Sequence, residues 1–180
     1  MKNLASAFAF GICLFVVSCS SSPSAGDVSA LGIKAIPVLA SPTYEKKWGK
    51  PKVRVSSSGT YEFTYANPAQ PFDRLSIFGA PKPFPALLSA PNFSKDEMIN
   101  DELTGVNYRQ SFRTVTVNGT PVRWFKESGS GGADGAYYST TGFSVTDSSG
   151  KTGHYRLVVE GGDDMEVEVA RRFSSVVLAP

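Results

Sequence analysis

Residues 115–125 read VTVNGTPVRWF, and this stretch decides the expected fold. Two β-rich runs, Val115–Val117 and Pro121–Phe125, flank the dipeptide Asn118-Gly119. Asn-Gly between such runs is the strongest short hairpin signal, because both residues tolerate the positive φ angles of a tight two-residue turn. The stretch therefore predicts two antiparallel strands joined by a tight turn.

Strand and turn signals repeat on both sides of this hairpin. Residues 52–56 and 61–65 alternate in character around the turn signal Ser57-Ser58-Gly59, and they predict a second hairpin with three aromatic residues on one face. Asn67-Pro68 and Gln70-Pro71 break the pattern after it. Three further strands are expected at 75–78, 143–146 and 155–159, the last two around a turn at 147–150.

Two internal segments carry helix signals, and a third lies at the C-terminal end. Residues 43–48 predict a short helix that ends at Gly49. A capping-box pattern over 94–97 predicts a second short helix through Leu103.

The C-terminal residues 165–178 allow both strand and helix. Alternation of Met165, Val167 and Val169 with two glutamates is a strand signature, whereas a longer stripe favours helix: Met165, Val169, Phe173, Val176 and Val177. Helix is favoured because Asp163 and Glu166 also have the spacing of a helix start. The expected fold is thus α+β, an antiparallel β-sheet with a short N-terminal helix and a C-terminal helix packed on one face.

Composition limits the classes of function. The 180 residues are 41% hydrophobic and 19% charged, which is typical of a folded globular chain rather than a disordered one. The net charge is only +2, and no basic stripe or acidic tail is expected, which argues against nucleic acid as a partner.

The first 19 residues contain both cysteines of the chain, Cys13 and Cys19. A positive start with Lys2 is followed by an apolar run over residues 4–17, which has the length of a signal-peptide core and is too short to span a bilayer of about 30 Å. Val16-Val17-Ser18-Cys19 then resembles the lipobox of bacterial lipoproteins. The resemblance implies cleavage before Cys19, diacylglycerol on its sulfur and a fatty acid such as palmitate on its new amino group.

This resemblance sets the expected domain organisation and location. Residues 1–18 are expected to be a signal peptide that is removed, and residues 19–30, rich in Ser, Pro and Gly, a flexible tether that begins with lipidated Cys19. Residues 31–180 are expected to form a single α+β globular domain. Ser20 after the cysteine resembles the pattern sorted to the outer membrane, with the domain on its periplasmic or surface face. The alternative is a secreted, unlipidated protein.

Catalytic signals are few. With Cys19 lipidated, the domain has no thiol for a disulfide, for catalysis or for a metal. His154 is the one histidine, so a Ser–His–Asp triad must use it, but no Gly-x-Ser-x-Gly motif is present. The two catalytic carboxylates of a glycoside hydrolase are brought together only by the fold, so the sequence cannot exclude them, and no local signal points to them.

Three short motifs have an ordinary structural interpretation. Gly150-Lys151-Thr152 resembles the end of a phosphate-binding loop, but Val145 occupies the position of its first glycine, so turn residues are expected. The glycine-rich residues 129–135 lead into Tyr137-Tyr138, which favours a loop followed by a strand. An acidic cluster is expected to serve helix capping and solvation rather than calcium: Glu160, Asp163, Asp164 and Glu166.

The sequence therefore predicts a membrane-anchored envelope lipoprotein that acts as a non-catalytic binding, scaffold or assembly module. The alternative is an envelope hydrolase that uses carboxylates or His154. The expected partners are the membrane, through the lipid, and a protein or glycan of the envelope. No catalytic residue, cofactor or metal ligand is predicted, and the many aromatic residues are expected mainly in the core.

Overall fold

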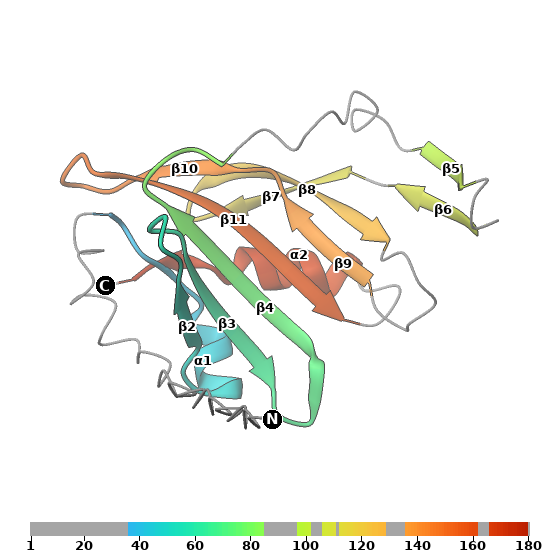
Figure 1. The fold of residues 1–180 in the computed structure, drawn as a ribbon, viewed down its shortest axis with the longest axis horizontal. Helices are drawn as coiled ribbons and strands as arrows, with labels where there is room; N and C mark the ends of the chain where they lie inside the picture. Colours follow the sequence, from blue (N-terminus) through green and yellow to red (C-terminus); the bar gives the residue numbers. More distant parts are fainter. Residues whose placement is uncertain are drawn as a thin grey trace, which may run out of the picture.

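The computed structural model describes residues 36–84, 97–101, 106–110, 112–128, 136–161 and 166–179. The leader, the tether and the lipidation position Cys19 lie outside the described residues. The elements are β1 (Leu39–Ala40), α1 (Pro42–Trp48), β2 (Lys52–Val55), β3 (Tyr61–Asn67), β4 (Gln70–Ala80), β5 (Glu97–Asp101), β6 (Val106–Gln110), β7 (Phe112–Val117), β8 (Thr120–Ser128), β9 (Ala136–Thr140), β10 (Phe143–Thr146), β11 (Thr152–Gly161), α2 (Glu166–Ser174) and β12 (Val177–Leu178) (Figure 1).

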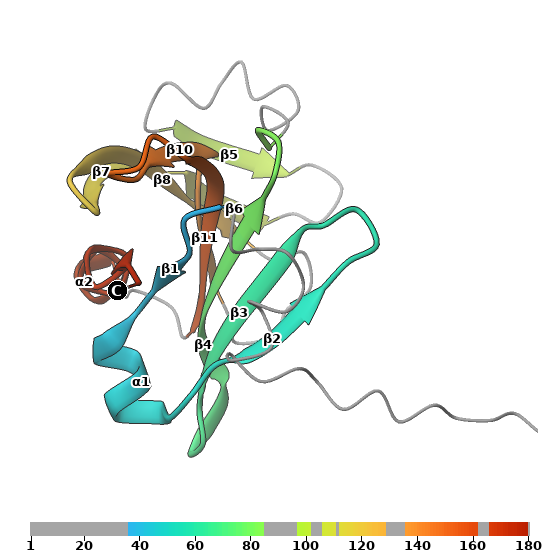
Figure 2. The same ribbon diagram turned by 90° about the vertical axis from the view of Figure 1, so that its left-hand side faces the viewer.

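An eight-stranded antiparallel sheet dominates the described chain. Its strand order is β2-β3-β4-β11-β9-β8-β7, and β10 pairs with β11 off this path. Figure 2 shows β2, β3, β4 and β11 following one another across the sheet. The prediction of an antiparallel sheet combined with helices is therefore confirmed, since two helices accompany the strands.

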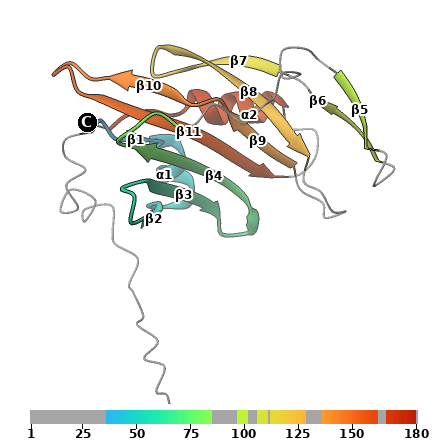
Figure 3. The ribbon, with the colours of Figure 1, turned by 45° about the horizontal axis from the view of Figure 1, so that its top comes forward.

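The predicted hairpins form at the predicted turns. β2 pairs with β3, and β7 pairs with β8 in a register that puts Val117 opposite Thr120. Asn118 and Gly119, between them, have φ angles of 47° and 77°, as a primed two-residue turn requires. β10 and β11 form a third hairpin, which extends beyond the neighbouring strands (Figures 1 and 3).

Two local expectations are wrong. The break expected at residues 67–71 is only a two-residue turn, because β4 already starts at Gln70 and includes Pro71, at the strand end where a missing amide hydrogen is tolerated. A register shift beside Asn67 absorbs the irregularity.

The helix expected through Leu103 is also wrong, since Glu97–Asp101 form β5 and pair along their whole length with Val106–Gln110. A capping box contributes only about 1 kcal/mol, and strand pairing outweighs it. Residues 94–96 and 102–103 lie outside the described chain.

Alternating strand residues build one buried core. Leu75 and Ile77 of β4 pair with the aromatic residues of β3 on one side and with β11 on the other. The β11 residues Tyr155, Leu157 and Val159 share one face, as predicted. These residues of β4 and β11, and the three aromatic residues of β3, are buried. Most aromatic residues whose burial is described lie in or against this core, as expected, although Phe72 is 83% exposed.

The C-terminal segment is helical, so the favoured alternative is confirmed. Val169 and Phe173 are buried in the core cluster, whereas Val167, which the strand alternative would have placed with Val169, is 86% exposed. The predicted stripe ran too far, because α2 ends at Ser174 and neither Val176 nor Val177 is on it. Val177 lies in β12, which pairs with β1 and brings the two ends of the described chain together.

Candidate functional site

A pocket of about 340 Å³ lies where α1 meets the last turn of α2. Its lining presents polar and apolar surface in nearly equal shares and consists of Thr43, Tyr44, Lys47, Arg171, Ser174 and Ser175. The two helices are far apart in sequence, and the hydroxyl groups of Ser41 and Ser175, 134 positions apart, are 2.7 Å from each other beside it. The pocket therefore exists only in the folded chain.

The spacing of α1 explains which of its side chains reach the pocket. Pro42 is well suited to a first helical position, where no amide hydrogen is needed. Residues four apart share a helix face, so Tyr44 and Trp48 lie together, with ring centroids 4.5 Å apart, and anchor the helix. Thr43 and Lys47 form the adjacent stripe, and both line the pocket.

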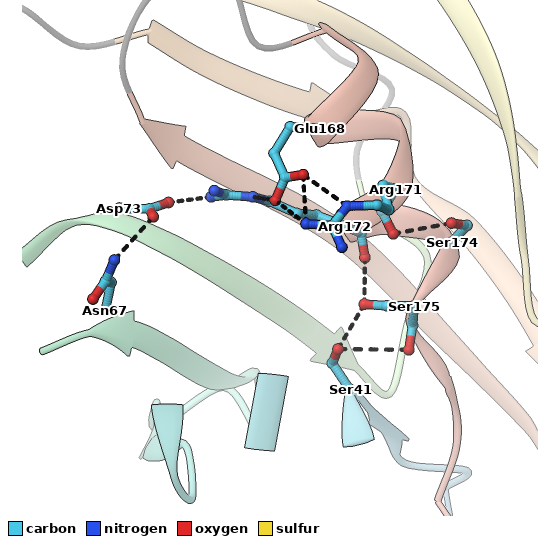
Figure 4. Close-up of polar contacts among 8 residues, drawn as sticks. All are labelled: Ser41, Asn67, Asp73, Glu168, Arg171, Arg172, Ser174 and Ser175. Atoms are coloured by element: carbon cyan, nitrogen blue, oxygen red, sulfur yellow. Dashed lines mark hydrogen bonds and ion pairs between the residues drawn. The ribbon is translucent and has the colours of Figure 1, made fainter. Parts of the chain in front are cut away.

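A network of charged side chains links α2, which forms one wall of the pocket, to β4 (Figure 4). Arg172 is only 3% exposed and forms an ion pair with Asp73 of β4. Its Nε also donates to Glu168 Oε1 at 3.1 Å. Arg171 binds the same Glu168 carboxylate through two nitrogens, at 2.7 and 2.8 Å. Asn67 completes the network by donating its Nδ2 to Asp73 at 3.3 Å.

Aromatic rings cover the buried guanidinium. The Arg172 Cζ atom is 5.5 Å from the centroid of the Trp48 ring and 5.9 Å from that of Tyr44, distances at which a cation is attracted to a ring face. α1 and α2 are thus held together by the same side chain that pairs with β4.

Charge and burial set the ionisation of these groups. Partial burial acts to raise the pKa of Glu168, but hydrogen bonds from Arg171 and Arg172 outweigh it and hold that pKa below its usual value. Burial raises the pKa of Tyr44 to about 12, against the opposing charge of Arg172. The Tyr44 phenol consequently stays neutral, and able to donate a hydrogen bond, at physiological pH.

The end of α2 is capped by hydroxyl groups. Ser174 Oγ donates to the Arg171 carbonyl at 2.9 Å, and Ser175 Oγ donates to the Arg172 carbonyl at 2.6 Å. Both carbonyls also accept from the Ser175 backbone amide, so each hydroxyl adds a second donor at the end of the helix. The hydroxyl bonds also hold both serines in place at the pocket wall.

The resulting pocket is suited to an anion. Arg171 and Arg172 are balanced by Glu168 and Asp73, so Lys47 adds a positive charge without a matching carboxylate. In the described part of the chain, the Lys47 amino group forms no ion pair and lies over the Trp48 ring, 5.3 Å from its centroid. Of the lining hydroxyls, those of Thr43 and Tyr44 can donate to a ligand, because Ser174 and Ser175 already donate to helix carbonyls. An ammonium together with hydroxyl donors can recognise a carboxylate or a phosphate.

His154 lies elsewhere, on the β10–β11 hairpin. Ser144 is its cross-strand neighbour, and Ser144 Oγ is 2.7 Å from His154 Nδ1. Among the described residues, no carboxylate is hydrogen-bonded to His154, and neither residue lines the pocket. The structure therefore brings a serine to the histidine without the acid that orients the histidine in a triad.

The other motifs have structural roles where they are described. Asp147 Oδ1 accepts from the backbone amides of Ser149 and Lys151, so Gly150-Lys151-Thr152 belongs to a tight turn and the first strand residue after it, as expected.

The two described residues of the acidic cluster form separate ion pairs. Glu160 pairs with Arg74, and Glu166 lies 3.4 Å from Arg113. Asp163, Asp164 and residues 129–135 lie outside the described chain. Within the ranges that are described, no three potential metal ligands cluster.

Sequence reasoning missed the pocket because its two walls share no local signal.

Comparison with protein-family models, curated proteins and solved structures finds no match for this chain. No helix among the described residues combines the length and apolar character needed to cross a membrane.

Proposed function

We propose that this protein is a lipid-anchored envelope lipoprotein whose domain is a non-catalytic binding module, and that the α1–α2 pocket binds a small anionic group. The anchor is supported by the leader residues that end at Cys19. The binding role is supported by the pocket, in which Lys47 faces no balancing carboxylate.

We also infer that α2 packs across one face of the sheet and forms part of the rigid wall of this pocket. Support comes from the rings of Trp124 in β8 and Phe173 in α2, whose centroids are 6.0 Å apart, and from the ion pair between Arg172 and Asp73. In Figure 2, α1 and α2 lie to the same side of β4 and β11. A wall fixed in this way costs little ordering on binding, which favours affinity.

Calorimetric titration tests the binding role. Glucuronate and inorganic phosphate are the anionic probes, and glucose is the neutral one. We expect an anion to bind, glucose not to bind, and Lys47→Gln to weaken binding about tenfold, which corresponds to the loss of a charge-assisted hydrogen bond. Lys151→Gln, on an exposed turn, is the matched control. No binding of either anion, or equal effects of both substitutions, would refute the pocket.

Mass spectrometry of the mature amino terminus tests the anchor separately. We expect a chain that begins at Cys19 and carries the mass of its lipids. A Cys19→Ser variant should lose membrane retention while the domain keeps its fold. An unmodified Cys19, or cleavage at another position, would contradict the lipoprotein assignment.

A hydrolase is the second candidate, because Ser144 Oγ lies 2.7 Å from His154 Nδ1. A serine activated by a histidine reacts with fluorophosphonate probes. Labelling of Ser144 that disappears in His154→Ala would favour the enzyme. Labelling that is absent or independent of His154 would leave the binding module as the better proposal.

A further inference from the structure

A run of cations occupies residues 46–54, here termed the basic segment. Its members are Lys46, Lys47, Lys50, Lys52 and Arg54, and no acidic residue occurs from position 46 until Glu62. All five cationic residues are exposed. Five of the chain's 18 Lys and Arg residues therefore gather in one short segment of a protein whose net charge is only +2. The expectation of no basic stripe is wrong at this segment.

The cations of the basic segment lack ion-pair partners. In the described part of the chain, none of the five lies within ion-pair distance of a carboxylate. Arginines elsewhere contrast with them, since four of these have carboxylate partners: Arg74, Arg113, Arg171 and Arg172. Glu45 precedes Lys46 and Glu62 lies opposite Arg54 in the β2–β3 register, so these carboxylates offset part of the charge, whereas Lys50 and Lys52 have no carboxylate at a neighbouring or directly opposite position.

The fold holds the basic segment in a fixed place. Trp48, at the end of α1, packs on Tyr44, and Val53, in the middle of β2, is fully buried, so both ends of the segment are anchored. β2 is an edge strand of the sheet, and among the described strands it pairs only with β3. Figures 1 and 2 show α1 and β2 together at one edge of the molecule. An edge rich in lysine also discourages pairing with another strand, which leaves this surface open.

We propose that the basic segment docks the domain onto the surface of an anionic phospholipid bilayer. This inference rests on the lipid anchor proposed above, because the segment closely follows the tether of residues 19–30. A chain tethered to a bilayer meets its surface at high effective concentration, which adds to the affinity that the untethered domain has for that surface. The lipid supplies the anchorage, and a basic surface near it would add electrostatic attraction to anionic lipids and orient the domain on the bilayer. Each cation near such a surface strengthens binding about fivefold at moderate salt.

Vesicle co-sedimentation tests the docking without the anchor. Residues 31–180 carry the whole described core, which runs from Leu39 to Val176, so this domain is suited to the assay. The vesicles are phosphatidylcholine alone, or phosphatidylcholine with one-third phosphatidylglycerol. We expect binding only to the anionic vesicles, and weakening as salt is raised, because the surface potential is screened.

Matched variants separate the basic segment from net charge. Lys50→Gln/Lys52→Gln should weaken binding to the anionic vesicles by about 25-fold, from about fivefold for each cation. Lys82→Gln/Lys151→Gln changes the net charge equally at exposed sites outside the segment and should bind like the unaltered domain. Circular dichroism confirms that each variant is folded.

Three outcomes would overturn the docking surface. They are equal binding to neutral vesicles, equal weakening by both variants, and equally tight binding to a DNA duplex, which would indicate a general affinity for polyanions. Neither Lys50 nor Lys52 lines the α1–α2 pocket. A domain that binds anions in its pocket but not anionic vesicles would therefore overturn the docking inference alone, and the mass of the mature amino terminus tests the anchor independently.

Discussion

Arg172→Met is the substitution that most directly tests how the pocket is built. Arg172 is 3% exposed, and its ion-pair partner Asp73 is only 15% exposed in its side chain. Methionine keeps the apolar contact with the rings of Tyr44 and Trp48, so the main loss is the charge. Removing one partner of a buried ion pair leaves the other charge uncompensated, at a cost of about 3–5 kcal/mol. For a domain of this size the melting temperature should fall by roughly 10 °C.

Guanidinium unfolding of residues 31–180, followed by circular dichroism, measures this loss. Arg171→Met is the matched control, because Arg171 binds the same Glu168 carboxylate but is 65% exposed, and an exposed pair contributes less than about 1 kcal/mol.

A double-mutant cycle shows whether the loss comes from the pair. Asp73→Asn should recover at least about 1 kcal/mol in the Arg172→Met background, because it removes the stranded charge. Equal losses for Arg172→Met and Arg171→Met, or strictly additive effects in the cycle, would refute the account of a buried ion pair.

Three further predictions follow from single contacts. Gly79→Ala should lower the unfolding free energy by about 1–3 kcal/mol, because a Cβ there overlaps the Tyr61 ring, and unchanged stability in denaturant would contradict this packing. Two arginines hold the Glu168 pKa below its usual value of 4.5 against the effect of burial, so this carboxylate contributes stability above about pH 4.5 that is lost as pH falls through the lower folded-state pKa. The stability gap between the protein and Glu168→Gln should accordingly close between pH 7 and pH 3, and a gap independent of pH would argue against the arginine contacts. Asn118→Ala should cost about 1–2 kcal/mol in thermal unfolding, since alanine resists a φ of 47° and cannot accept the hydrogen bond from the Leu178 amide; Asn118→Gly should cost less.

Local chemistry was sufficient for much of the fold. Asn118-Gly119 predicted its hairpin because positive φ angles are a property of those two residues in any context. The stripe of Val169 and Phe173 predicted α2 because helical periodicity is likewise a local pattern. Local signals failed where they conflicted with strand pairing, at Pro71 and over residues 97–101. A paired strand there outweighs a local conformational preference of about 1 kcal/mol.

The sequence by itself thus determined the turns, most of the strands, the closing helix and the prediction of a lipid on Cys19. Only the tertiary structure decided that β4 pairs with β11, and so which residues meet across the middle of the sheet. The pocket between α1 and α2 depends on that pairing and on Arg172 reaching Asp73, a contact between positions 99 apart. The basic segment was visible in the sequence, but its exposure and its lack of carboxylate partners were not. Such properties arise from contacts between distant segments, which no local periodicity encodes.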